Sequence, residues 1–183
     1  MIKLVDLLNE EKETHSYGCV MLYFDFPQMN KIHDAINPDD VYNEDGSDSS
    51  YSPFGLEDEP HCTLLYGLHD GVTTEEIKDV LDKYTYSTVK AYNASLFENP
   101  NYDVLKFDIK GDNMNETNAD LKKYPFTSDY PDYHPHMTVA YLKTGTGKRY
   151  VKMLKDVEFD LAPQYAVYSK PNGDKDKIAV KVD

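Results

Sequence analysis

The stretch PHCTLLYG, residues 60–67, is repeated later in the chain as PHMTVAYL, residues 135–142. Both copies place Pro, His, Thr and Tyr at the same spacing, with apolar residues or cysteine between them. Short runs of this kind predict β-strands. The two histidines, His61 and His136, are 75 residues apart (136 − 61). We therefore expect two similar lobes, each of which contributes one strand to a shared site.

The charge of the chain restricts the class of ligand. The 183 residues carry a formal net charge of -14, and Arg149 is the only arginine. Binding of a long nucleic acid depends on many Lys and Arg contacts to phosphates, and phosphate clamps usually use arginine. We therefore expect a small ligand whose phosphates are held by histidines, hydroxyls, a few lysines and backbone amides.

The cysteines and the apolar runs indicate a cytosolic protein. Cys19 and Cys62 are too few for a disulfide framework and match no zinc spacing. No apolar run reaches the roughly 20 residues of a membrane helix. The acidic segment 1–13 is typical of a short amphipathic helix rather than of a signal peptide. At this length we expect a single bilobal domain over residues 1–183, with no membrane contact.

The pattern of apolar and turn-forming residues predicts an α+β fold. Strands are expected at 19–26, 61–66, 89–97, 102–109, 136–142, 164–169 and 177–182, and helices at 28–36, 73–83, 113–124 and 146–155. This order predicts two similar lobes related by a pseudo-two-fold, each a mainly antiparallel sheet with helices on its outer face and the sheets facing a central cleft. The acidic, Ser-rich residues 37–53 predict a flexible loop, with a mobile lid as the alternative.

The repeated strands carry the candidate catalytic residues. Side chains alternate across a strand, so His61 and Thr63 share one face, and so do His136 and Thr138. One neutral imidazole can take a proton from an attacking oxygen while a protonated imidazole donates one to the leaving oxygen. The threonine hydroxyls can donate hydrogen bonds to the phosphate oxygens. These four groups favour a phosphodiesterase that needs no metal and no cofactor.

The paired motifs resemble those of the two-histidine phosphoesterase superfamily, whose members carry one His-x-[Ser/Thr] motif in each lobe. Within it, the chain is similar to the phage anti-CBASS phosphodiesterases, which destroy the cyclic di- and trinucleotide signals of bacterial antiphage immunity. The stretches that carry the resemblance are SYGCVMLYFD (16–25), EDEPHCTLLYGLHD (57–70), FENPNYDVLKFD (97–108), TSDYPDYHPHMTVAYLK (127–143) and VYSKPNG (167–173).

The resemblance also implies ligand-binding residues. A tyrosine that touches the ligand in that family corresponds to Tyr17. The family glutamate near the final strands has no counterpart, because the stretch LAPQYAVYSK offers Gln164 and no carboxylate between the leucine and the lysine. Gln164 can hydrogen-bond a base or ribose but cannot act as a base. The chain has no tryptophan, so Tyr92 or Phe97 would replace the aromatic contact that tryptophan makes in the family.

The resemblance implies cleavage of the 3′–5′ bonds of cyclic oligonucleotides in the cytoplasm of an infected bacterial host, in evasion of its CBASS defence. A ribose 2′-hydroxyl would attack the adjacent phosphorus. Which histidine is base and which is acid stays open, as do base preference, ring size and oligomeric state.

Three other interpretations remain open. A metallohydrolase would use His134 and His136, with His61, His69, Asp129 or Asp132 completing a metal site. A sponge would bind the cyclic nucleotide without cutting it, in keeping with the missing glutamate. A third class acts on 2′,3′-cyclic phosphates or RNA ends.

Overall fold

A single antiparallel sheet organises the fold. The computed structural model describes residues 14–43 and 55–183. Its elements are β1 (Gly18–Asp25), α1 (Met29–Asp34), a 3₁₀ turn η1 (Pro38–Asp40), β2 (His61–Leu68), α2 (Thr74–Leu81), β3 (Thr85–Tyr86), β4 (Val89–Glu98), β5 (Tyr102–Lys110), α3 (Met114–Leu121), β6 (His136–Lys143), α4 (Lys148–Met153), β7 (Phe159–Ser169), β8 (Lys175–Ala179) and β9 (Lys181–Val182). The sheet order is β2-β1-β7-β4-β5-β6, with β8 on β7, and β3 pairs with β9 in parallel.

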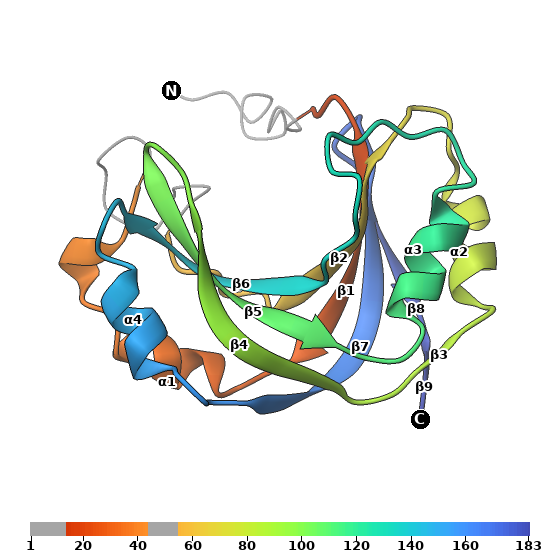
Figure 1. The fold of residues 1–183 in the computed structure, drawn as a ribbon. Helices are drawn as coiled ribbons and strands as arrows, with labels where there is room; N and C mark the ends of the chain where they lie inside the picture. Colours follow the sequence, from red (N-terminus) through yellow and green to blue (C-terminus); the bar gives the residue numbers. More distant parts are fainter. Residues whose placement is uncertain (1–13, 44–54) are drawn as a thin grey trace, which may run out of the picture.

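Strand β7 joins two lobes. Its first residues, 159–161, pair with β4, and residues 162–169 pair with β1. One lobe thus contains β2, β1 and β8 with most of β7, and the other contains β6, β5 and β4. The sheet is strongly curved, and the helices lie outside its two arms (Figure 1). The predicted α+β class and two-lobed arrangement are therefore confirmed.

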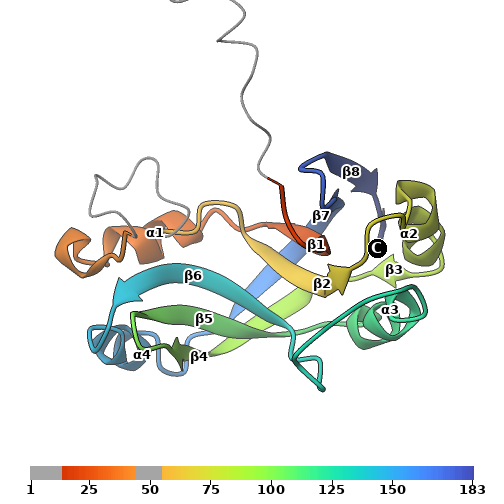
Figure 2. The same ribbon diagram turned by 90° about the horizontal axis from the view of Figure 1, so that it is seen from above.

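The chain crosses between the lobes. Helix α3, which precedes β6 in sequence, packs on β2, and helix α1, which precedes β2, packs on β6. The end strands β2 and β6 lie side by side and run in opposite directions (Figure 2). This exchange places the two repeated strands next to each other although they belong to different lobes.

The outer faces of the sheet carry the hydrophobic core. Cys62 and Met137, the residues between His and Thr in each repeat, are completely buried. So are Leu22 on β1, which lies between two partly exposed residues, and Phe107 on β5. The period-two alternation of strands puts these apolar side chains under the helices, and leaves the polar residues of each repeat on the concave face.

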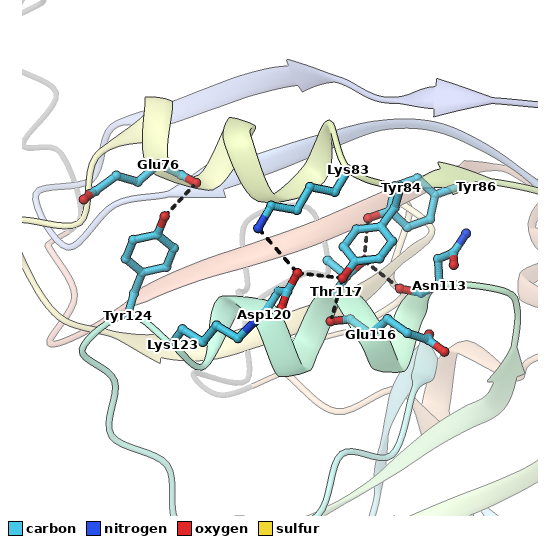
Figure 3. Close-up of polar contacts among 10 residues, drawn as sticks. All are labelled: Glu76, Lys83, Tyr84, Tyr86, Asn113, Glu116, Thr117, Asp120, Lys123 and Tyr124. Carbon is cyan, nitrogen blue, oxygen red and sulfur yellow. Dashed lines mark hydrogen bonds and ion pairs between the residues drawn. The ribbon is translucent and has the colours of Figure 1, made fainter.

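Helices α2 and α3 are fastened to each other by polar contacts (Figure 3). Thr73 and Glu76 form a capping box at the start of α2. Just after the C-terminal end of α3, the Tyr124 hydroxyl donates to the Glu76 carbonyl of α2 at 3.4 Å. Asp120 of α3 accepts a hydrogen bond from Tyr84 at 2.6 Å and pairs with Lys83. These bonds fix the helical layer behind β2.

The elements differ from the sequence prediction mainly at their ends. Strand β7 begins at Phe159, five residues before the predicted start at Gln164. Proline within a run argues against a strand interior, but Pro163 lies beside a register shift between β1 and β7, and such irregularities are where strands tolerate proline. The last predicted strand, 177–182, is divided between β8 and β9, which pair with different strands.

Residues 37–43 are the described part of the predicted flexible loop, and within them residues 40–43 are buried or partly buried. Asp40 is buried and accepts a hydrogen bond from the Tyr150 hydroxyl, and it also pairs with Arg149. Val41 forms a β-bridge with Leu142 at the edge of β6. The packed region is therefore longer than the acidic composition indicated. The rest of the loop and the N-terminal helix expected at 1–13 lie outside the described residues.

Candidate active site

The two repeats fold into the same local structure. His61 and Thr63 on β2, and His136 and Thr138 on β6, are all partly exposed, whereas the residue between each pair is buried. The carbonyl of the proline before each histidine accepts a bond from the neighbouring strand, at 2.9 Å in both lobes. The four side chains singled out from the sequence therefore share the concave face of the sheet.

Each histidine ring is held by the backbone two residues before it. His61 Nδ1 lies 2.7 Å from the Glu59 carbonyl oxygen, and His136 Nδ1 lies 2.9 Å from that of His134. Because a carbonyl oxygen only accepts, Nδ1 must carry the hydrogen in both rings. In the neutral imidazole, Nε2 is then the nitrogen that can take a proton. Both rings are thus fixed in the same tautomer.

A β-bulge follows each threonine. Leu64 of β2 and Val139 of β6 are skipped in the pairing with β1 and β5. Each bulge carbonyl accepts a bond from a helix of the outer layer: Asn118 Nδ2 donates to Leu64 O at 2.6 Å, and His33 Nε2 lies 2.9 Å from Val139 O. The sequence pattern predicts no role for Asn118 or His33, which bind the equivalent bulge carbonyls of the two repeated strands.

Tyr133 ties the two halves of the site together. Its hydroxyl donates to the Thr63 carbonyl at 2.9 Å and lies 3.9 Å from the Cys62 sulfur. Tyr133 comes three residues before His136, so this bond fixes the approach to β6 against the backbone of β2. Burial raises the pKa of Tyr133 well above its usual value. The hydroxyl therefore stays protonated and donates.

Burial disfavours the nucleophilic thiolate form of the two cysteines near the site. Burial raises the pKa of Cys19 to about 11 and that of Cys62 to about 12. Since the thiolate is the reactive form, neither sulfur is activated at neutral pH. Cys62 is completely buried and belongs to the hydrophobic core.

The surroundings of His61 are aromatic. Tyr23 of β1 lies opposite His61 in the strand pairing, with ring centroids 5.2 Å apart and an interplanar angle of 26°. Tyr165 of β7 stacks on the other side of Tyr23 at 5.3 Å, and Lys177 lies 3.9 Å from its ring centroid. Glu57 is close enough for its charge to interact with His61, and burial raises the pKa of that carboxyl.

The surroundings of His136 are charged. Asp108 and Lys106 of β5 lie opposite His136 and Thr138. Lys106 Nζ is 2.5 Å from Asp108 Oδ1, and Asn93 donates to the other carboxylate oxygen at 2.6 Å. Lys106 is the only buried lysine of the described residues.

The neighbours of His136 shift its pKa in opposite directions. Burial lowers the pKa of His136, and the charges of Lys106 and His61 lower it further, against the raising effects of the His134 carbonyl and Asp108. Burial alone would raise the pKa of Asp108, but bonds from Lys106 and Asn93 hold it below its usual value. The two histidines, which are equivalent in backbone geometry, therefore differ in their electrostatic environment.

The other sequence-predicted ligand residues are spread along the concave face. Phe97 contacts His136 edge-on at 5.0 Å and lies 4.7 Å below the Lys106 ammonium. Tyr92 of β4 pairs with Asp108. Tyr17 lies at the far end of β1, where it stacks on His69 at 5.8 Å.

Gln164 is exposed and lies at the register shift of β7. It follows Pro163 and precedes Tyr165, so it lies next to the aromatic surroundings of His61. None of the hydrogen bonds found among the described residues involves its side chain.

Sequence reasoning missed Lys106, Asp108, Tyr23 and Tyr133. A signal was present for the first two, because KFDIK (106–110) places three charges at alternate positions, with apolar residues between them. Tyr133 gave no such signal, since its partner is a backbone carbonyl 70 residues away. Among residues 14–43 and 55–183, no three His, Cys, Asp or Glu side chains form a group that could hold a metal.

Comparison with known proteins agrees with this geometry. The family model described as anti-CBASS protein Acb1 matches residues 54–170, more than half of the chain and including both repeats. Among solved structures, Usb1 of Kluyveromyces marxianus with uridine monophosphate is similar, with a TM-score of 0.54 and 9% sequence identity, covering 90% of this chain and 98% of that one. At that identity the likeness shows the fold alone. A search of the curated proteins found no match.

In the described part of the chain, no helix is long and apolar enough to cross a bilayer.

The family match covers the two anchored histidines and their threonines, and the neighbour shares the two-lobed fold. The chain therefore belongs to the anti-CBASS protein Acb1 family and is a two-histidine phosphodiesterase that acts on cyclic nucleotides.

Proposed function

We propose that the protein cleaves the 3′–5′ bonds of cyclic di- and trinucleotides by metal-independent transesterification. The observation that carries this proposal is the identical anchoring of two histidine rings, each bonded through Nδ1 to the carbonyl two residues before it. Such a pair can hold a base and an acid on either side of one phosphorus, the arrangement that an in-line displacement needs.

In this reaction His136 is the general base. Its lowered pKa keeps the ring neutral, so Nε2 removes the proton from the ribose 2′-hydroxyl. The 2′-oxygen attacks phosphorus and the bond from phosphorus to the 5′-oxygen breaks. His61, protonated, gives its Nε2 proton to the departing oxygen. The product is a linear chain with a 2′,3′-cyclic phosphate at one end and a free 5′-hydroxyl at the other. The proton that His136 gains equals the proton that His61 loses.

Three side chains hold the phosphate in this proposal. The hydroxyls of Thr63 and Thr138 donate to the non-bridging oxygens, where negative charge must be stabilised. Lys106 supplies the positive charge, and Asp108 is its one hydrogen-bond partner among the described residues. A buried ammonium with donors to spare favours a further anionic partner. The single arginine, Arg149 of α4, forms an ion pair with Asp40.

The family match supports a proposed biological role. Destruction of cyclic oligonucleotide signals in the cytoplasm of the infected bacterium would let a phage evade CBASS defence. The net charge of -14 supports a small ligand over a long nucleic acid.

The test is turnover of 3′,3′-cyclic dinucleotides and a cyclic trinucleotide in EDTA, followed by chromatography and mass spectrometry. Wild type should give linear products that end in a 2′,3′-cyclic phosphate, and His61→Ala and His136→Ala should give none. His15→Ala, at an exposed histidine, is the matched control and should cleave like wild type. Ligand that is bound but returned intact would make the protein a sponge. Activity that disappears only in EDTA would refute the metal-independent mechanism.

A further inference from the structure

The helices behind the two repeated strands carry a repeat of their own. Helix α1 begins MNKIH at Met29, and helix α3 begins MNETN at Met114. Both methionines are buried, and the fifth residue of each run, His33 or Asn118, lies one turn further along the same face of its helix. These fifth residues are the side chains that bind the bulge carbonyls of β6 and β2, and we call them the two bulge clamps.

Asn118 is an unfavourable residue for its place in the helix. The buried residues of α3 form a core-facing stripe of Met114, Thr117, Asn118 and Leu121. A buried amide costs free energy unless it is hydrogen-bonded, and asparagine is a weaker helix former than leucine. The Asn118 side chain is nevertheless there, with the residue 5% exposed and Nδ2 only 2.6 Å from Leu64 O. The bond to β2 therefore explains the residue better than the helix does.

The bonded carbonyls belong to the residues that follow the two catalytic threonines. Leu64 follows Thr63 and Val139 follows Thr138, and both are skipped in the strand pairing. A β-bulge bends its strand, increases the local twist and, beside an active site, sets the direction of a side chain. A donor from the helix behind the strand thus fixes the bulge, and with it the direction of the threonine hydroxyl.

The bulge of β2 is also bonded to the segment that leads into the other histidine. The Thr63 carbonyl, next to the clamped Leu64 carbonyl, accepts the bond from the Tyr133 hydroxyl at 2.9 Å. Tyr133 directly precedes His134, whose carbonyl holds the His136 ring. A displacement of this bulge would therefore be passed to the His136 ring.

The bulge of β6 has the corresponding connection to the first histidine. Val139 O lies 2.9 Å from His33 Nε2 and accepts a second bond from the backbone N–H of Glu57 at 3.0 Å. The Glu57 carboxylate accepts a bond from the Glu59 N–H at 3.0 Å, and the Glu59 carbonyl holds the His61 ring. The path from α1 to His61 thus mirrors the path from α3 to His136.

We propose that Asn118 and His33 are positioning residues of the phosphodiesterase, each of which fixes, through one bulge, the threonine of the strand it contacts and the histidine of the other strand. This inference rests on the proposed function and deepens it, because it explains how an acid and a base from different lobes keep a fixed alignment across one phosphorus. Neither clamp touches the substrate.

Loss of a clamp should act on the transition state. In the proposed function the threonine hydroxyls stabilise charge that develops during the displacement, and the two imidazoles must be aligned with the attacking and leaving oxygens. A misplacement of about 1 Å, even from a change far from the chemistry, can cost about 100-fold in rate. We therefore expect kcat and kcat/KM to fall together while KM stays nearly unchanged.

The first experiment compares variants that keep or lose the donor, with a 3′,3′-cyclic dinucleotide as substrate. Asn118→Leu and His33→Leu remove the donor and should each lower kcat about 10- to 100-fold. His33→Gln, whose amide can donate to the same carbonyl, should restore most of the rate. Tyr84→Phe is the control: it removes a 2.6 Å bond to Asp120 of α3 that does not involve β2 (Figure 3), so kcat should stay at the wild-type value.

The second experiment follows the crossed connection without turnover. The Cε1–H resonances of His61 and His136 are recorded by NMR and assigned with the alanine variants of the two histidines. Asn118→Leu should shift the His136 resonance, and His33→Leu should shift that of His61. His33→Gln and Tyr84→Phe should leave both resonances in place.

The outcomes separate this inference from the proposed function. Unshifted resonances with unchanged kcat in the folded leucine variants would overturn the positioning role, and so would a loss of melting temperature alone. Equal rates in His33→Leu and His33→Gln would overturn it as well. If Asn118→Leu does not fold, the His33 pair, at a partly buried site, decides the question. If wild type cleaves no cyclic dinucleotide, the proposed function fails, and the two resonances still decide whether the clamps hold the histidines.

Discussion

The titration of His136 should respond in opposite directions to the loss of its two charged neighbours. Asp108 lies directly opposite His136 in the β5–β6 pairing, a position in which Cβ atoms are about 5 Å apart. Two unit charges at about 5 Å interact by about 0.8–3.3 kcal/mol at effective dielectric constants of about 80–20, or about 0.6–2.4 pH units. Because the Asp108 side chain is 29% exposed and paired with Lys106, we expect the lower half of that range.

Asp108→Asn should therefore lower the pKa of His136 by about 0.5–1.5 units, since the imidazolium loses an opposite charge. Lys106→Met should raise the pKa, because it removes a like charge and leaves Asp108 unneutralised. The assay is the pH titration of the His136 Cε1–H resonance, assigned with His136→Ala. The acid limb of kcat/KM should move with it, since His136 must be neutral to act as base.

The control is Asp112→Asn, an exposed carboxylate just after β5 that should leave the resonance unmoved. Shifts of the same sign in Asp108→Asn and Lys106→Met would refute the electrostatic account. An acid limb that follows His61 instead of His136 would refute the assignment of the base and leave the pair of histidines in place.

Two further expectations concern the frame of the site. Tyr133→Phe removes the donor to the Thr63 carbonyl, so we expect the free energy of unfolding to fall by about 1–2 kcal/mol in urea denaturation, with a loss of kcat; an effect no larger than that of the same substitution at an exposed tyrosine of that loop would contradict the linking role. Gly67 has φ +108°, and a Cβ there would meet the Thr127 carbonyl oxygen at 1.9 Å, so Gly67→Ala should lower the melting temperature far more than Gly71→Ala, where φ is +100° in open space. Equal losses would mean that backbone strain alone, and not the contact across β2, explains the glycine.

Local features of the structure could be predicted from the sequence because they depend on residues that are close together in the chain. The alternation of His, apolar residue and Thr determines which side chains share a face of β2 or β6, since the period of a strand is two. The Thr73–Glu76 capping box is likewise a matter of spacing. The fold class followed from the order of such elements, and the repeat itself indicated two lobes.

Contacts between segments that are far apart in the chain could not be predicted from the sequence. That α1 supports β6 while α3 supports β2 depends on how the chain crosses between lobes, and no local pattern encodes it. The asymmetry of the site has the same origin: β1 sets Tyr23 against His61, and β5 sets Asp108 against His136. Pairing partners are chosen by the packing of whole strands.

The sequence by itself thus predicted the four groups proposed to perform the chemistry and determined the strands on which they lie. Only the tertiary structure decided which histidine has the charged neighbours, which tyrosine joins the two strands, and which helical side chain holds each bulge. The physical reason is that a strand's alternation is fixed by covalent geometry, whereas a bulge, a pKa and a cross-lobe hydrogen bond depend on residues that are far apart in the chain.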